Sequence, residues 1–253
     1  MRLALVTGGC HRVGAAIAGR LAEAGWALAL HGRHAAEPDP SLLARLEKAG
    51  CVWHGFAADL ADKDELAALV GRVAKHFGVA PTLLVNNASL FGNDDPATMT
   101  HDALVAHFAV NTAAPVLLAR EVAARVGEDE TAVIVNILDQ RIRHPVGDQA
   151  SYTISKLALA GATEMLARAL APRARVCGIA PGLTLPTEDY RPAQMDEIRA
   201  AMPLQLLPDP EDVADSVLYL ARARATTGQV IYVDGGANLA AFKRDFVYLG
   251  TGG

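Results

Sequence analysis

The chain has 253 residues, of which 51% are hydrophobic, and this is enough for one large α/β domain with a substantial core. Its formal net charge is −5 and its basic residues are scattered, so the sequence does not favour nucleic-acid binding. No apolar run reaches the roughly 20 residues that span a bilayer, and the N-terminal residues predict a strand instead of a cleavable leader, so we expect a cytoplasmic protein with no membrane partner.

Short apolar runs alternate with longer segments of helical periodicity. The runs are mostly continuous, which is typical of parallel strands buried on both faces. The predicted strands are residues 3–6, 27–31, 51–57, 82–86, 132–138, 174–180 and 229–233. After the helix that follows the first strand, the predicted helices are residues 62–77, 99–126, 150–171 and 210–223. This alternation predicts an α/β fold, a Rossmann-type doubly wound parallel sheet with helices on both faces, in a single domain over residues 1–253.

The stretch TGGCHRVG, residues 7–14, joins the first strand to the first helix. A glycine-rich turn that opens a helix offers backbone N–H groups and the positive helix end to a phosphate. Gly8, Val13 and Gly14 are therefore candidate cofactor-binding residues. Arg12 is unexpected, because it stands where the commonest form of this turn has its middle glycine.

The end of the second strand distinguishes between the two nicotinamide cofactors. NAD-binding sequences usually have an acidic residue there, whereas this one has LHGRHAAE, with His31, Arg33 and His34 before the first acid. Cationic side chains bind a 2′-phosphate through charge-assisted hydrogen bonds, to which Arg12 can add. We therefore predict NADP(H) as the cofactor. The alternative is that Arg33 and His34 form an ordinary polar turn.

Polar residues also follow the third and fourth strands. Asp59, with Leu60 beside it, can accept a hydrogen bond from the adenine amino group, or it can be an N-cap or turn aspartate. The stretch LVNNAS brings Asn87, Ala88 and Ser89 to the end of the fourth strand, where buried amides need partners. We expect both strand ends to lie in the cofactor cleft.

The stretch SYTISK contains Tyr152 and Lys156. Their spacing places both on one face of a helix. A lysine ammonium favours the phenolate, so we expect the pKa of Tyr152 to fall from about 10 toward neutrality, which would make it a general acid. The alternative is a chance surface pair.

Taken together and in this order, the motifs resemble the short-chain dehydrogenase/reductase family. The glycine turn, NNAS, Asn111, the Tyr152–Lys156 pair, APG at 180–182 and YVDGG at 232–236 carry the resemblance. It implies a sheet of about seven strands and often a homotetramer. It also implies that Asn111, Tyr152 and Lys156 are catalytic, with Asn111 holding a water or the position of Lys156.

The resemblance adds residues to the cofactor site. Tyr152 and Lys156 are expected to bind the cofactor as well as to act in catalysis. The residues expected to flank the nicotinamide are Pro181, Gly182 and Thr184.

Two residues depart from the usual family pattern. Asp139 stands thirteen residues before the tyrosine, where the family usually has Ser, and Arg12 replaces a turn glycine. Both departures, together with an aromatic residue at Phe91, recur in the pteridine reductase and dihydromonapterin reductase branch, which the chain resembles. An ionised Asp139 would repel the charge that grows on a carbonyl oxygen, whereas beside Tyr152 it can hold the N–H groups of a pterin and help relay a proton. It is therefore expected to be catalytic.

We therefore expect NADPH-dependent reduction of a 7,8-dihydropterin, such as dihydromonapterin or dihydrobiopterin, or of dihydrofolate, to the tetrahydro form. Arg12 would bridge the cofactor phosphate and the substrate, and Phe91 would stack on the pterin; the alternatives are that Arg12 binds phosphate only and that Phe91 packs in the core or the lid. The predicted substrate-binding residues are Arg12, Ser89, Phe91, Asp139, Tyr152 and Leu183. A reductase of another carbonyl or imine, and a catalytically weak NADPH-binding regulator, remain alternatives.

Three cysteines form no CxxC pair and the histidines form no HExxH motif, so we expect reduced thiols and no metal site. Residues 183–209 follow a strand end and predict a substrate lid; the alternative is a surface excursion with one short helix. Residues 240–253 form a C-terminal extension with three aromatic residues. It either docks on a neighbouring subunit, where Arg244 would reach the partner's site, or packs on its own subunit.

Overall fold

Seven parallel strands form one sheet in the order β3-β2-β1-β4-β5-β6-β7 in the computed structural model, which describes residues 1–186 and 190–249. The strands are β1 (Leu3–Val6), β2 (Ala27–Gly32), β3 (Trp53–Ala57), β4 (Leu83–Asn86), β5 (Ala132–Ile137), β6 (Ala174–Pro181) and β7 (Val230–Val233). The order reverses between β1 and β4, so the polar residues that follow these two strands meet at the switch point where such sheets bind ligands. The predicted doubly wound sheet is confirmed.

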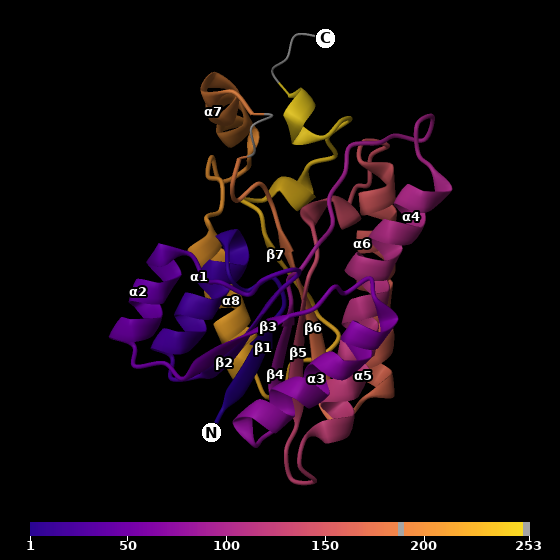
Figure 1. Cartoon of the computed structure of the whole chain (residues 1–253). Helices are drawn as coiled ribbons and strands as arrows, with labels where there is room; N and C mark the ends of the chain where they lie inside the picture. The colour runs from indigo at the N-terminus through magenta and orange to yellow at the C-terminus, as the bar shows by residue number, and fades with distance from the viewer. Residues whose placement is uncertain (187–189, 250–253) are drawn as a thin grey trace.

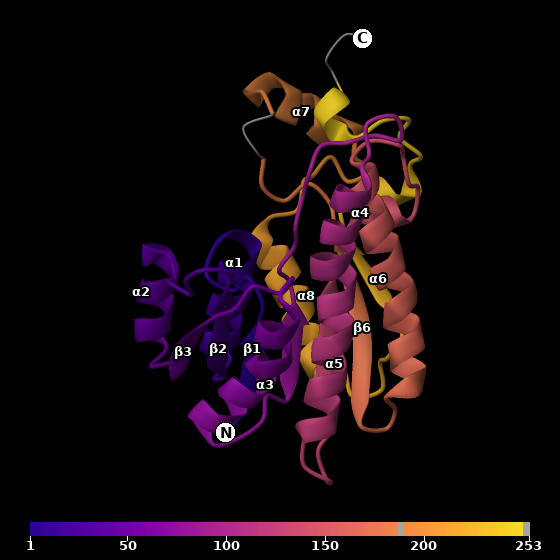
Figure 2. The same cartoon turned by 45° about the vertical axis from the view of Figure 1, so that its right-hand side comes forward.

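Helices cover both faces of this sheet (Figures 1 and 2). One layer consists of α1 (Arg12–Glu23), α2 (Pro40–Lys48) and α8 (Pro210–Arg222). The other consists of α3 (Lys63–Phe77), α4 (His101–Phe108), α5 (Ala114–Arg125) and α6 (Ala150–Ala169). Each layer encloses its own hydrophobic cluster against the strands, which is why β1, β4 and β5 are buried along their whole length.

Two helical predictions differ from the structure. The helix expected over residues 99–126 is divided into α4 and α5 by a π-helical turn, Ala109–Ala113, which contains Asn111. Helix α2 was not predicted, although Asp39 caps it by accepting a hydrogen bond from the backbone N–H of Leu42 and a proline follows at its first position. The short α2 buries only two of its own residues, so its apolar pattern is weak.

One helical stretch, His101–Arg125, is long enough to cross a membrane and contains an 18-residue window with a mean hydropathy of 1.4. In this fold α4 and α5 pack against α6, and α5 also packs against α3 and the central strands β4 and β5. The apolar side chains of this stretch therefore contribute to the packing of one helical layer against the sheet.

Beyond the carboxyl ends of the strands lie α7 (Pro192–Ala201) and a 3₁₀ turn, Phe246–Tyr248, near the C-terminus (Figure 1). They share a small hydrophobic cluster, with Ile198 and Met202 from the α7 segment packed against Phe246 from the tail. The short helix that the sequence allowed within 183–209 is thus present, and the tail packs on its own chain. Residues 187–189 of the predicted lid and 250–253 of the extension lie outside the described residues.

Candidate active site

The glycine turn after β1 is closed tightly onto the start of α1. Gly8 has φ +59°, and a Cβ atom at Gly14 would lie 2.0 Å from the Gly8 carbonyl oxygen. Asn87 stabilises the turn, because its Nδ2 donates to the carbonyl oxygens of Thr7 and Gly8 at 2.9 and 3.0 Å. Ala88 packs against the hydrophobic core beside it. The residues predicted at the end of β4 therefore shape the phosphate turn.

His31 also supports this turn, which corrects its predicted role as a direct cofactor ligand. Its Nδ1 accepts a hydrogen bond from the Gly8 N–H at 3.2 Å, and its Nε2 donates to the Ala58 carbonyl at 2.8 Å. Burial lowers the pKa of His31, because it disfavours the imidazolium. With both ring nitrogens committed to backbone, His31 links β2 to the turn and does not face a ligand.

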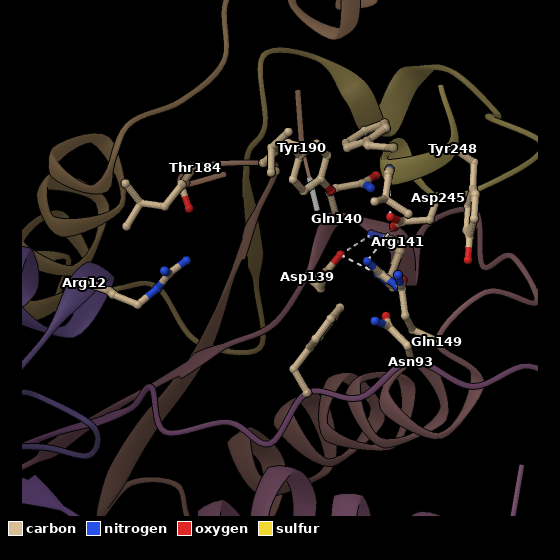
Figure 3. A pocket seen from close by; sticks show the side chains of 16 residues that line it. Arg12, Asn93, Asp139, Gln140, Arg141, Gln149, Thr184, Tyr190, Asp245 and Tyr248 are labelled. Atoms are coloured by element: carbon tan, nitrogen blue, oxygen red, sulfur yellow. Dashed lines mark hydrogen bonds and ion pairs between the residues drawn. The ribbon is translucent and has the colours of Figure 1, made fainter. Parts of the chain in front are cut away.

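Arg12 has a backbone conformation that explains why glycine is common at this position. Its φ is +54°, in the left-handed region, which costs a non-glycine residue roughly 1–2 kcal/mol. Its exposed side chain extends into the large cavity from the side opposite Asp139 (Figure 3). Helix α1 has neither a side-chain cap nor an acid in its first turn, whereas Asp62 and Asp209 cap α3 and α8. The start of α1 is thus left positive for an anion.

Arg33 was predicted to bind the 2′-phosphate and Asp59 the adenine amino group, and in the structure these two side chains form an ion pair with each other. Two guanidinium nitrogens of Arg33 donate to Asp59 Oδ2 at 3.0 and 2.9 Å. Asp59 also accepts a hydrogen bond from the Ala61 N–H, and this bond, followed by Arg33, holds the pKa of Asp59 below its ordinary value. Asp59 is thus a turn aspartate that orients Arg33, while Leu60 is buried in the core and His34 is exposed.

Asn111 was expected to hold a water or the position of Lys156, and within the described residues its side chain makes no hydrogen bond to Lys156. Its Oδ1 accepts hydrogen bonds from the Leu90 N–H at 2.7 Å and the Ser89 hydroxyl at 3.2 Å. Its Nδ2 donates to the Leu90 carbonyl at 2.8 Å and to the Ser155 hydroxyl at 2.9 Å. Asn111 therefore ties the loop after β4 to α6, and in this way it positions Ser89.

Tyr152 and Lys156 lie on one face of α6 as predicted, with Nζ 5.6 Å from the centre of the tyrosine ring. Lys156 is buried and donates to the Ile137 carbonyl at 2.8 Å, and burial lowers its pKa to about 8. The expected fall in the pKa of Tyr152 is wrong for this structure: burial, and then the charge of Asp139, raise it above its ordinary value. Its hydroxyl donates to Asp139 Oδ2 at 3.0 Å, so the phenol carries its proton at neutral pH.

Asp139 is held by an arginine that the sequence reasoning missed. The backbone N–H and Nε of Arg141 donate to Asp139 Oδ1 at 2.9 and 3.1 Å. Nη2 of the same guanidinium donates to Asp245 Oδ2, in the C-terminal tail, at 2.8 Å. Within the described residues, Oδ1 of Asp139 accepts two hydrogen bonds and Oδ2 accepts one, from Tyr152, so Oδ2 is the oxygen with capacity for another partner.

Phe91, the aromatic residue predicted to stack on the substrate, lies beside Tyr152. The ring of Phe91 meets the Tyr152 ring edge-on, with centres 5.0 Å apart, and 49% of Phe91 is exposed. Across the site, Pro181 ends β6, and Gly182, Leu183 and Thr184 continue from it into the predicted lid segment.

A cavity of about 670 Å³ joins these parts (Figure 3). This volume is within the usual range for small-molecule sites, about 300–1,000 Å³. Ser89 and Tyr152, both predicted to bind substrate, are not among the residues that line it, although Tyr152 contacts two that do, Asp139 and Phe91. The predicted residues on the wall are Arg12, Phe91, Asp139, Gly182, Leu183 and Thr184. Leu185 and Tyr190 on the wall belong to the predicted lid, and the wall residues that were not named for the site are Asn93, Gln140, Arg141, Gln149, Asp245, Phe246, Val247 and Tyr248.

A doubly wound sheet, a glycine turn after its first strand and a Tyr–Lys pair beside the cavity define an oxidoreductase site built for a nicotinamide dinucleotide. Residues 10–238 match the family model described as enoyl-(acyl carrier protein) reductase. An uncharacterized oxidoreductase of Mycobacterium tuberculosis is 34% identical over 242 residues, which are 93% of this chain and 91% of that protein. The chain belongs to the short-chain dehydrogenase/reductase family.

Two solved structures resemble the whole domain. The protein named FolM alternative dihydrofolate reductase 1 of Brucella canis, complexed with NADP, is 38% identical with a TM-score of 0.87, over 94% of this chain and 95% of that one. A short-chain dehydrogenase of Burkholderia cenocepacia, also complexed with NADP, is 34% identical with a TM-score of 0.83, over 94% of this chain and 98% of that one. The predicted cofactor, NADP(H), is the one that both of these structures hold.

Proposed function

We propose that the protein reduces a 7,8-dihydropterin, such as dihydromonapterin or dihydrobiopterin, or dihydrofolate, to its tetrahydro form with NADPH. The observation that carries the proposal is the Asp139 carboxylate, held by Arg141 and directed at the Tyr152 hydroxyl at a position where the family usually has serine. The similarity of the whole chain to a protein named for dihydrofolate reduction supports the same proposal.

The residues of the cleft fit NADPH, which would supply the hydride. The uncapped start of α1 and the Arg12 guanidinium offer positive charge to the pyrophosphate. Arg33 and His34 lie on the surface at the end of β2, where a 2′-phosphate would compete with Asp59 for the Arg33 guanidinium.

The Arg33→Met variant is expected to bind NADPH about 10–100-fold more weakly, because hydrogen bonds to charged groups contribute roughly 1.5–3 kcal/mol. Its affinity for NADH, which has no 2′-phosphate, should stay within about twofold of the native value. Quenching of intrinsic fluorescence by each cofactor would measure both dissociation constants. Equal losses for the two cofactors would assign the 2′-phosphate to other residues.

The side chains around the cavity suit a flat, hydrogen-bonding ring system. Asp139 can accept hydrogen bonds from ring N–H and amino groups through the oxygen that now accepts from Tyr152. Phe91 offers an exposed ring at the same edge of the cavity. The Tyr152 hydroxyl would donate the proton that a reduced C=N nitrogen needs, and Arg12 would contact the polar edge of the pterin from the far side.

The proposal is tested by following NADPH absorbance with dihydrobiopterin, dihydromonapterin and dihydrofolate in parallel, using NADH as the control cofactor. We expect turnover of at least one of the three with NADPH and much slower turnover with NADH. If none is reduced while a ketone or another imine is, the protein is a different short-chain reductase. If NADPH binds but no substrate is reduced, the protein is a regulator.

A further inference from the structure

The Arg141 guanidinium is buried between two carboxylates that come from distant parts of the chain. Asp139 lies on one side of it and Asp245 on the other, and 7–19% of these three side chains is exposed. Asp245 is 104 residues away from Arg141 in the sequence. A tail residue thus contacts the same guanidinium that holds the site carboxylate.

The tail is fixed on both sides of Asp245. Asp148, in the loop before α6, accepts hydrogen bonds from the Arg244 guanidinium and, at 2.8 Å, from the backbone N–H of Asp245. On the other side, Gln194 of α7 donates to the carbonyl oxygens of Phe246 and Val247 at 3.2 and 2.7 Å. The position of the Asp245 carboxylate is therefore set by the docking of the tail on the loop and on α7.

We propose that Asp245 is a positioning residue for the active site: by holding Arg141 from the tail side, it keeps the Asp139 carboxylate oriented toward the Tyr152 hydroxyl. The C-terminal segment is in this way a working part of the catalytic site of its own chain. The expected effect of Asp245 on pterin turnover rests on the proposed function, whereas its effect on the hydrogen bond between Tyr152 and Asp139 does not.

The hydrogen-bond partners of Arg141 show why Asp245 is needed. Nε is used by Asp139, Nη1 donates to Gln149 and Thr153, and Nη2 donates to Asp245. Without the Asp245 carboxylate, the guanidinium loses the partner that opposes Asp139, and a buried N–H is left without its charged acceptor. The guanidinium would then shift, and its Nε bond to Asp139 Oδ1 would shift or break, which leaves that oxygen held by the backbone N–H of Arg141 alone and lets the carboxylate turn away from Tyr152.

The charges of this network act on Tyr152, in addition to the hydrogen bond that joins Tyr152 to Asp139. Asp139, Arg141, Lys156 and Asp245 all lie around it, from the loop after β5, from α6 and from the tail. The charges of Asp139 and Asp245 raise the pKa of Tyr152 beyond the effect of burial, and that of Arg141 lowers it. Removing the charge of Asp245 would therefore lower the pKa of the Tyr152 phenol.

The test compares the full-length Asp245→Asn and Asp245→Glu variants with native protein. Asp215→Asn is the matched control, because it removes a carboxylate from the exposed Arg20–Asp215 pair far from the cavity. The first readout needs no substrate: the ¹³C NMR signal of Cζ-labelled Tyr152, assigned by its loss in Tyr152→Phe, reports the hydrogen bond to Asp139. The second is pterin turnover, measured well below the melting temperature of each variant.

We expect Asp245→Asn to move the Tyr152 signal and to lower kcat between about 10-fold and 100-fold, as small misplacements of catalytic groups do. NADPH affinity should be unchanged, Asp245→Glu should restore part of both effects, and Asp215→Asn should show neither. An unmoved Tyr152 signal, or a native-like kcat in Asp245→Asn, would overturn the inference. If the native protein turns over no pterin, the proposed function fails, and the Tyr152 signal alone decides the positioning role.

Discussion

We expect the Tyr152→Phe variant to lose dihydropterin turnover by about 10²–10⁴-fold, which is the contribution of a well-placed general acid. Phenylalanine keeps the ring that meets Phe91 edge-on and that lies under the Arg141 guanidinium, so packing is retained. Only the hydroxyl that donates to Asp139 is lost. The dissociation constant of NADPH should therefore stay close to the native value.

Single-turnover reduction with bound NADPH would measure the chemical step directly. Tyr219→Phe is the matched control, since it makes the same chemical change at a tyrosine that is 58% exposed on α8, away from the cavity. A Tyr152→Phe enzyme that reduces dihydropterin at the native rate would mean that another group, or water, delivers the proton.

The Asp139→Ser variant is expected to lose pterin turnover by about 100-fold or more while keeping its affinity for NADPH, because loss of a positioned proton-handling group has this size of effect. Serine cannot accept hydrogen bonds from several pterin N–H groups as a carboxylate does. Arg141 keeps Asp245 as a partner, so the guanidinium is not left without a counter-charge.

The same variant has an opposite expected effect on carbonyl substrates. Removing the Asp139 charge takes away one cause of the raised pKa of Tyr152, and serine can donate a hydrogen bond to a carbonyl oxygen. A ketone tested beside the pterins should therefore be reduced no more slowly than by the native enzyme. Undiminished pterin turnover in Asp139→Ser would remove Asp139 from the mechanism.

The strands could be predicted because a continuous apolar run is a purely local signal, strongest in β1, β4 and β5, which are buried along their whole length. All seven apolar runs are strands, and their ends differ from the predicted ones by at most two residues. The division between α4 and α5 could not be predicted, because a π-helical turn leaves the apolar periodicity almost unchanged. Within the site, the glycine turn and the Tyr152–Lys156 spacing were visible for the same reason, since both are set by a few neighbouring residues.

The roles that were predicted incorrectly depend on partners distant in the sequence. His31 is polar and stands where a cofactor ligand was expected, but Gly8 and Ala58 occupy both of its ring nitrogens. Asn111 was expected to hold a water or the position of Lys156, and its amide spans from Ser89 to Ser155 on α6, a pairing that the sequence did not suggest. No local pattern shows which backbone group will meet a buried side chain.

The sequence by itself determined the doubly wound sheet, the position of the glycine turn and the placement of Tyr152 and Lys156 on one helix face, because each depends on periodicity or on short spacing. Only the tertiary structure decided the state of those residues. The pKa of Tyr152 is raised instead of lowered, because folding buries the phenol and places the Asp139 carboxylate against it. The arginine that holds Asp139 is itself held by Asp245, and only folding brings these distant residues together.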